Sequence, residues 1–303
     1  MQKTIMFLCA SLISVPIASV YLDDPLSALQ TEALVTVGWI YLAASFIAFL
    51  AGELSKNYSQ VDRLWSTIPI AYVWVMAAYD WTARTVLMAS LVTLWGVRLS
   101  LNFTRRGGFS WVPWRGEEDY RWSVLQKNPL FDNRLAWSAF NLGFICYYQM
   151  GLVLLMTLPM IPVLGSDVPL GLADYVLAAV LVGLVAMETL ADQQQWEFHR
   201  EKGRLKASAE EMPPRYAKGF VAEGLWSWCR HPNYFAEQSF WVVFYGFSVA
   251  ATGRWVNGSA AGFILLLLLF QGSANFSEGI SAGKYPAYKK YCESRPRFIP
   301  KPW

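Results

Sequence analysis

The segment from Arg230 to Glu237 carries the densest set of side chains that could do chemistry, in the order Arg-His-Pro-Asn-Tyr-Phe-Ala-Glu. Pro232 suits the first turn of a helix, where its missing N–H costs no hydrogen bond. The N-terminal end of that helix, next to Arg230 and His231, is a suitable place for a phosphate or carboxylate. Glu237 follows at the edge of an apolar stretch, where an unpaired carboxylate is expensive, so we expect it to accept hydrogen bonds from a ligand or a neighbouring helix. A boundary arginine, a capping proline and an interfacial aromatic explain the same segment without a ligand.

A second polar set, Glu188, Asp192 and Gln195, lies at the end of another apolar stretch. The spacing of four and three residues places these side chains on one face of a helix. Polar groups at that depth must face protein or a water-filled cavity rather than lipid. A carboxylate and an amide together can hold ribose hydroxyls or the edge of an amide, which suits a nucleotide. A purely structural polar network between helices is the alternative.

A cationic helix face is predicted from Trp95, Arg98, Asn102 and Arg105, which are three or four residues apart. Arginine forks bind phosphate oxygens through two hydrogen bonds, and the glycines at 107 and 108 allow a backbone to approach closely. The alternative is that Arg105 and Arg106 are ordinary anchors at the membrane boundary, which is the simpler interpretation for Arg106.

Asp62 precedes an apolar stretch and could donate a proton if burial raises its pKa. It could equally pair with Arg63 or cap the helix that follows. In the C-terminal tail, Tyr285, Tyr288 and Tyr291 recur at three-residue spacing, ahead of Arg295. A helix lying at the membrane interface explains this spacing, and a wall against a nucleotide ring is the alternative.

The elements that must position these residues are membrane helices. Of the 303 residues 55% are hydrophobic and 16% are charged, and the mean hydropathy is +0.28, whereas roughly a quarter of the residues in an ordinary soluble domain are charged. We predict an all-α, polytopic transmembrane helix bundle with eight spans, or seven if a short one is discounted. The expected spans are Thr4–Tyr21, Leu34–Ala51, Thr67–Tyr79, Thr85–Leu101, Ala136–Leu164, Leu170–Ala191, Phe235–Ala251 and Ala260–Gly272.

The distribution of positive charge supports this topology. With Lys3 in the cytosol, the predicted outer loops hold only two basic residues, Arg84 and Arg254, of the 25 Lys and Arg in the chain. Because loops rich in Lys and Arg stay in the cytosol, we expect both termini there, in a multi-pass protein of the bacterial inner membrane with its active site facing the cytosol. Residues 1–20 could instead be a cleaved signal peptide. The chain is expected to form one integral membrane domain, with peripheral N-terminal helices in residues 1–60 and a core in residues 61–303.

Several site classes are excluded. The two histidines are too few for a multi-histidine metal centre, and the four cysteines are scattered without a CxxC pair. The sequence contains no GxGxxG, GxxxxGK[ST] or HExxH motif, so a Rossmann or Walker fold does not hold any nucleotide that binds. The expected partners are the lipid bilayer and a hydrophobic small molecule, not nucleic acid, and no metal is expected.

A combination of these residues resembles the steroid 5-alpha-reductase C-terminal superfamily, especially its uncharacterised bacterial membrane branch. Sterol C14 and C7 reductases share this C-terminal pattern, and isoprenylcysteine carboxyl methyltransferases carry a related Arg-His-Pro-x-Tyr signature. The resemblance is best from about Glu188 to Trp303, with weaker support at Asp62–Trp65 and Trp95–Arg105. The residues that carry it are Arg230, His231, Pro232, Asn233, Tyr234, Glu237, Tyr288, Tyr291, Arg295, Ile299 and Pro300.

The resemblance implies that NADPH lies among the later helices in a cavity open to the cytosol. The cofactor ligands that it implies are Asp192, Gln195, Arg230, His231, Asn233, Tyr234 and Glu237, with Arg98, Asn102 and Arg105 at the phosphates and Tyr288, Tyr291 and Arg295 as a closing wall. It places a glutamate of the reductases against the substrate carbonyl, and Asp62 is the nearest counterpart. Two departures, Trp95 in place of a tyrosine and the shorter side chain of Asp62, put a steroid substrate in doubt.

The expected reaction is hydride transfer from NADPH to the β-carbon of an activated C=C bond in a hydrophobic, steroid- or isoprenoid-like enone. Two other functions stay open. A methyltransferase would use S-adenosylmethionine in the same C-terminal pocket without needing Arg98 and Arg105. A non-catalytic lipid-binding protein would bind neither nucleotide.

Overall fold

The computed structural model describes residues 10–11, 14–18, 21, 23–110, 112, 116–208 and 211–301. All regular elements in this part of the chain are helices, which confirms the all-α prediction. The chain divides into two compact units. Unit 1 consists of Met1–Ala179 and Val243–Leu266, and unit 2 consists of Val180–Val242 and Leu267–Trp303.

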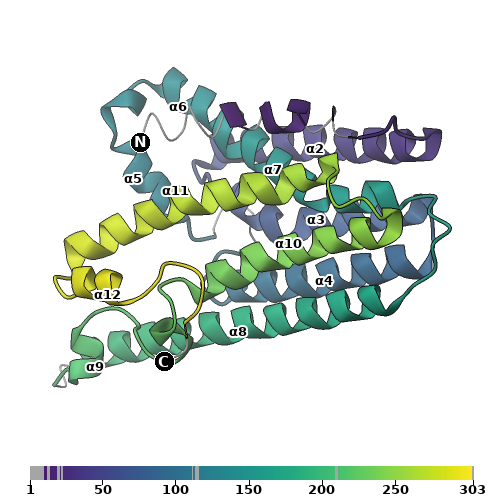
Figure 1. Ribbon diagram of the computed structural model, residues 1–303. Helices are drawn as coiled ribbons and strands as arrows, with labels where there is room; N and C mark the ends of the chain where they lie inside the picture. Colours follow the sequence, from purple (N-terminus) through teal and green to yellow (C-terminus); the bar gives the residue numbers. More distant parts are fainter. Residues whose placement is uncertain are drawn as a thin grey trace. The chain divides into compact units, whose positions relative to one another are not determined.

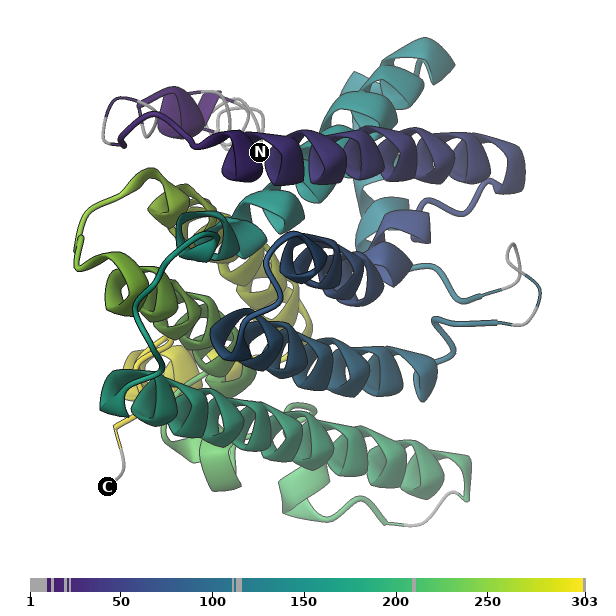
Figure 2. The same ribbon diagram turned by 90° about the vertical axis from the view of Figure 1, so that its right-hand side faces the viewer.

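Unit 1 is built on three consecutive helices, α2 (Ala28–Ser55), α3 (Gln60–Tyr79) and α4 (Ala83–Thr104). Helix α3 packs against both of the others and lies between them (Figures 1 and 2). Local sequence sets where two of these helices begin. Ser27 and Gln30 exchange side-chain and backbone hydrogen bonds at the start of α2, and Thr82 and Thr85 do the same at the start of α4.

The polar segment that follows contains α5 (Tyr120–Gln126) and the 3-10 helix η1 (Pro129–Phe131). A long helical stretch comes next, where we expected the span Ala136–Leu164. It joins α6 (Arg134–Phe140), the π-helix η2 (Asn141–Tyr148), α7 (Gln149–Thr157) and the 3-10 helix η3 (Leu158–Val163). Within unit 1, α7 packs against α2 and α3.

Ion pairs join the loops at one end of unit 1. The Arg84 guanidinium donates to both carboxylate oxygens of Asp174, at 2.7 and 2.9 Å, and both side chains are almost fully buried. The same guanidinium donates to the carbonyls of Val168 and Pro169. Elsewhere in these loops, Arg254 pairs with Asp24.

The remaining elements are α8 (Leu172–Ala207), α9 (Pro214–Ala217), η4 (Gly224–Ser227), α10 (Pro232–Thr252), η5 (Gly258–Ala260), α11 (Ala261–Lys284) and α12 (Tyr288–Ser294). Unit 2 contains α9, η4, α12 and most of α8, together with the first half of α10 and the later part of α11. Helix α10 begins at Pro232, as the sequence predicted.

Five helical stretches are long and apolar enough to cross a membrane: Ala28–Ser55, Ala83–Thr104, Arg134–Val163, Leu172–Ala207 and Gly258–Lys284. They coincide with five of the eight expected spans and indicate an integral membrane protein. The expected spans Thr67–Tyr79 and Phe235–Ala251 are helical, within α3 and α10, but those helices are not among the five. The expected first span, Thr4–Tyr21, lies largely outside the described residues.

Candidate functional site

The polar face of α8 is present in unit 2, where it meets the start of α10. Glu188 and Asp192 are 5% and 4% exposed, and Gln195 is half-buried. The side-chain amide of Asn233 donates to Asp192 Oδ1 at 3.1 Å, and its carbonyl oxygen accepts the backbone N–H of Tyr234 at 3.0 Å. Predicted residues from α8 and α10 therefore form one acid–amide pair, in which Asp192 is buried and Asn233 is half-buried.

The segment before α10 is fastened to α8 by hydrogen bonds. The side chain of Gln194 accepts the backbone N–H of Leu225 at 3.0 Å, and the Trp226 indole donates to the carbonyl of Ala191 at 3.0 Å. Gly224 has a φ of +59°, and an added Cβ would lie 2.5 Å from the Gln194 side chain. This position therefore requires glycine for both conformation and space.

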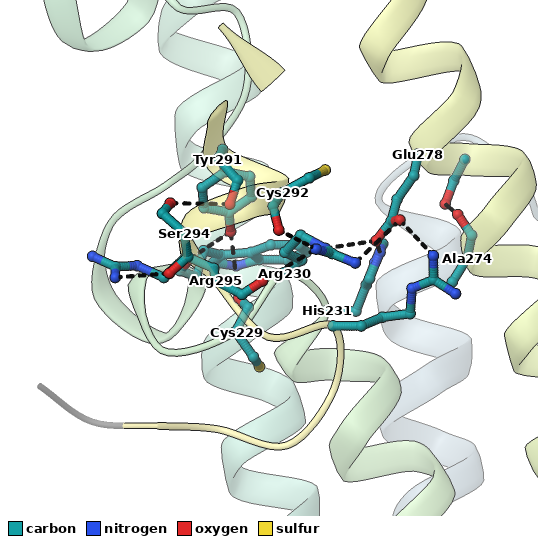
Figure 3. A network of polar contacts seen from close by, with 12 residues as sticks. Cys229, Arg230, His231, Ala274, Glu278, Tyr291, Cys292, Ser294 and Arg295 are labelled. Carbon is teal, nitrogen blue, oxygen red and sulfur yellow. Dashed lines mark hydrogen bonds and ion pairs between the residues drawn. The ribbon is translucent and has the colours of Figure 1, made fainter. Parts of the chain in front are cut away.

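Two arginines and a histidine converge on Glu278 of α11, an arrangement that we call the Glu278 clasp (Figure 3). Its Oε1 accepts from Arg230 Nε at 2.8 Å and contacts His231 Nε2 at 2.9 Å. Its Oε2 accepts from Arg297 Nη2 at 2.9 Å and from Arg230 Nη2 at 3.3 Å. Hydrogen bonds between charged groups are the stronger ones, so the clasp links α10, α11 and the C-terminal segment tightly.

The rest of the Arg230 guanidinium also binds protein groups. Its Nη1 donates to the carbonyls of Cys292 and Arg295, at 2.6 and 3.1 Å. Three backbone hydrogen bonds join residues 228–231 to residues 296–301. They run from Arg230 N to Pro296 O, from His231 N to Arg297 O and from Lys301 N to Trp228 O. The geometry makes Arg230 an anchor of the C-terminal segment, and its contact with a cofactor stays a prediction.

The predicted C-terminal wall is packed inside unit 2. Tyr288 and Tyr291 are buried against Phe220, with ring centroids 4.9 and 5.2 Å apart from that ring. The Tyr291 hydroxyl donates to the backbone carbonyl of Trp226. Burial raises the pKa of both tyrosines, so both stay protonated near neutral pH. These rings hold the C-terminal segment in place, and their contact with a nucleotide ring stays a prediction.

Two other predicted residues follow along α10. The Tyr234 ring stacks on the His231 imidazole, with centroids 5.0 Å apart and an interplanar angle of 15°. Glu237 is buried and accepts a hydrogen bond from the Trp241 indole at 3.1 Å. This hydrogen bond comes from one turn further along the same helix, and one from a ligand or a neighbouring helix stays a prediction.

The predicted phosphate contacts lie on α4, in unit 1. Arg98 is buried, and Asn102 and Arg105 are half-buried. Asn102 Oδ1 accepts from Arg105 Nε at 2.8 Å, which brings two of the three together. That these residues share one site with those of α8 and α10 stays a prediction.

Asp62, the predicted acid, lies in the first turn of α3 in unit 1. Its Oδ2 accepts a hydrogen bond from the Trp122 indole at 3.0 Å. Trp122 comes from residues 116–122, which we call the strap. The strap is bound to the residues before α3 by hydrogen bonds from Asn57 Nδ2 to Gly116 O, from Tyr58 N to Glu118 Oε1 and from Asp119 N to Ser59 Oγ, at 2.6 to 2.8 Å.

The carboxyl groups in this region differ in their pKa values. Burial raises the pKa of Asp62 and outweighs the nearby Arg121 guanidinium, which lowers it. Burial also acts to raise the pKa of Asp119, but the Arg121 fork, at 2.8 and 2.9 Å, holds it below its usual range. The surroundings thus separate the pKa values of two neighbouring carboxyl groups. Such a separation suits a site in which one group acts as an acid and the other stays ionised.

Sequence reasoning missed Glu278, Arg297 and Trp122. For Glu278 a signal was available, because a lone carboxylate on an apolar helix demands a partner, the argument already applied to Glu237. The sequence around Arg297 and around Trp122 gives no comparable signal. Trp122 is 60 residues from Asp62, so only the fold reveals their contact.

Comparisons with known proteins match most of the chain to one family. The family described as "Protein of unknown function (DUF1295)" matches residues 48–295, a range that contains the candidate residues from Asp62 to Arg295. An uncharacterised protein of the fission yeast Schizosaccharomyces pombe is 33% identical over 283 residues, which cover 86% of this chain and 80% of the yeast protein. No solved structure matches the chain.

Proposed function

This chain belongs to the DUF1295 family, and on that premise we propose that it is an NADPH-dependent membrane reductase. Its substrate is a hydrophobic enone of steroid or isoprenoid type, whose activated C=C bond is reduced.

The hydrogen-bonded pair of Asp192 and Asn233 is the observation that supports this proposal most directly. A carboxylate accepts hydrogen bonds from ribose hydroxyls, and a side-chain amide can both donate to and accept from a carboxamide. Gln195 adds a second amide on the same helix face. This donor and acceptor set fits the nucleoside end of a nicotinamide dinucleotide, and the cationic face of Arg98, Asn102 and Arg105 fits its phosphates.

Asp62 is proposed to act on the substrate. Bound NADPH would supply the hydride. Because burial raises the pKa of Asp62, its protonated carboxyl can donate a hydrogen bond to the substrate carbonyl oxygen, which makes the β-carbon more electrophilic. The Trp122 indole orients this carboxyl through Oδ2. The oxygen that carries the proton then faces the substrate.

Eight spans with both termini in the cytosol complete the proposal, so that the site opens to the cytosolic NADPH pool. Single cysteines at Lys218 and Trp255 test this orientation in sealed membranes. We expect an impermeant thiol reagent to label Lys218→Cys from the cytosolic side and Trp255→Cys from the opposite side. Labelling of both from one side would contradict the topology.

Calorimetry of the detergent-purified chain tests the cofactor. We expect saturable NADPH binding that is lost in Asn233→Ala and weakened in Arg98→Ala. Asn275→Ala, an exposed asparagine on α11, is the matched control and should bind normally. Binding of S-adenosylmethionine without any NADPH signal would reject the reductase in favour of a methyltransferase.

A further inference from the structure

Tyr72 on α3 carries a hydroxyl group with no hydrogen-bond partner among the described residues. The residue is 0% exposed, so water does not reach the hydroxyl from the surface. A buried hydroxyl gives up its hydration and normally finds a protein partner in exchange. Exceptions are few, and each calls for a physical explanation, such as a group that binds only in another state of the protein.

Two polar side chains near Tyr72 have hydrogen-bond partners. Tyr41 of α2 is close enough to interact electrostatically with Tyr72, and its own hydroxyl donates to the carbonyl of Tyr147 at 3.2 Å. On α3, the Trp65 indole donates to Gln149 Oε1 at 2.9 Å. The Tyr72 hydroxyl is therefore a buried donor without a partner beside side chains that have one.

The position of Tyr72 is set by helix geometry. Trp65, Pro69 and Tyr72 are spaced i, i+4 and i+7, so they share one face of α3. The Trp65–Gln149 hydrogen bond shows that this face is directed at α7. Tyr41 approaches from α2. The hydroxyl thus lies in the region where α2, α3 and α7 pack against one another.

The helices around this region are irregular. Residues 141–148, which lead into α7, form a π-helix, and α3 contains Pro69 in its interior. Gly151 on α7 gives space to the Tyr41 hydroxyl, which would lie 3.4 Å from an added Cβ. π-Helical segments and internal prolines occur at functional sites and hinges, because their backbone hydrogen bonds rearrange at low cost.

We propose that Tyr72 donates a hydrogen bond to the carbonyl oxygen of an uncharged, apolar ligand that enters between α2, α3 and α7. A ketone or enone fits because the hydroxyl needs an acceptor. Fully buried apolar side chains on these helices include Val37, Val73, Met76, Met150, Leu152 and Val153. Helices α2, α3 and α7 pack directly against one another in this structure, so the ligand must displace them to enter. The π-helical residues 141–148 change conformation to allow this displacement. Tyr72 follows Asp62 by ten residues on α3, which is about 15 Å along the helix axis. One carbonyl oxygen cannot accept from both, so this ligand site goes beyond the proposed function.

Paired probes that differ only in a carbonyl group test this assignment on the full chain in detergent. The probes are 4-cholesten-3-one with cholest-4-ene, and geranylacetone with the hydrocarbon of the same skeleton. Affinity for each is measured for wild type, Tyr72→Phe and the matched control Tyr41→Phe. Because one neutral hydrogen bond is lost, we expect Tyr72→Phe to weaken binding of at least one ketone by roughly three- to tenfold and to leave its hydrocarbon partner unchanged. Tyr41→Phe should retain the wild-type ratio between ketone and hydrocarbon.

Thermal unfolding without ligand gives a second readout. Tyr72→Phe should keep or raise the wild-type melting temperature, because it removes an unsatisfied group, whereas Tyr41→Phe should lower it by leaving the Tyr147 carbonyl without its donor. An equal loss for ketone and hydrocarbon, no saturable ketone binding, or a destabilised Tyr72→Phe would each overturn the assignment. Absence of NADPH binding beside a Tyr72-dependent ketone preference would reject the reductase and leave this ligand site standing.

Discussion

Replacing Glu278 with glutamine removes the carboxylate on which Arg230, His231 and Arg297 converge. Glu278 and Arg230 are each only 11% exposed in their side chains, so the two arginine charges lose a largely buried partner. Removing one member of a buried ion pair costs about 3–5 kcal/mol. The glutamine amide still offers one acceptor, and Arg297 is 30% exposed and can turn to water. We therefore expect the low end of that range, about 3 kcal/mol.

Thermal unfolding and limited proteolysis should both detect this loss of stability. For domains of 150–250 residues, 1 kcal/mol shifts the melting temperature by about 2–4 °C, so Glu278→Gln should melt roughly 6–12 °C lower in detergent. The C-terminal segment should also loosen, which exposes the backbone at Lys289 and Lys290 to trypsin. Glu293→Gln, an exposed acid on α12, is the matched control and should behave as wild type.

One result would refute this reasoning. If Glu278→Gln kept both the wild-type melting temperature and the wild-type tryptic pattern, the clasp would contribute nothing to holding the C-terminal segment. The backbone hydrogen bonds between residues 228–231 and 296–301 would then have to hold it alone.

Four further substitutions concern Asp62, its hydrogen-bond donor Trp122 and two glycines. Because burial raises the pKa of Asp62 in the folded protein, wild type should lose stability as pH rises through that pKa, whereas Asp62→Asn should not; melting curves across a pH series check the sign. Trp122→Phe removes a donor to the ionised carboxylate, so infrared titration should show the pKa of Asp62 raised further, by roughly half to one unit. Gly224→Ala should destabilise by about 1–3 kcal/mol through its positive φ and its contact with Gln194. Gly203→Ala, on α8 with open space around it, should stabilise by about 0.5–1 kcal/mol. Thermal unfolding separates these two opposite signs, and equal shifts for both would contradict the local argument.

Hydropathy and start signals predicted the helices of this chain well, because both are local properties. Five of the expected spans coincide with helices long enough to cross a membrane, and α10 begins at Pro232. The ends of helices were less predictable. Helix α8 continues to Ala207, well beyond the apolar residues, supported there by pairs such as Glu201 with Arg204 at 2.9 Å. The hydropathy falls where the apolar residues of α8 end, but the helical hydrogen bonds continue past that point.

The candidate site was predictable as a set of residue types but not as a set of pairs. Helical spacing and the cost of buried charge singled out Asp192, Arg230 and Glu237. That Asp192 meets Asn233 and that Arg230 meets Glu278 depends on how distant segments pack, 41 and 48 residues away along the chain. A polar residue in an apolar helix indicates that it needs a hydrogen-bond or charge partner, and the tertiary structure determines which residue that partner is.

The ion pairs at one end of unit 1 bear on the predicted topology. The two arginines in the loops that we expect on the outer side of the membrane, Arg84 and Arg254, are each matched by a carboxylate, Asp174 and Asp24. A charge without a partner is expensive near a membrane. In the folded protein neither arginine leaves an uncompensated charge at this end of unit 1.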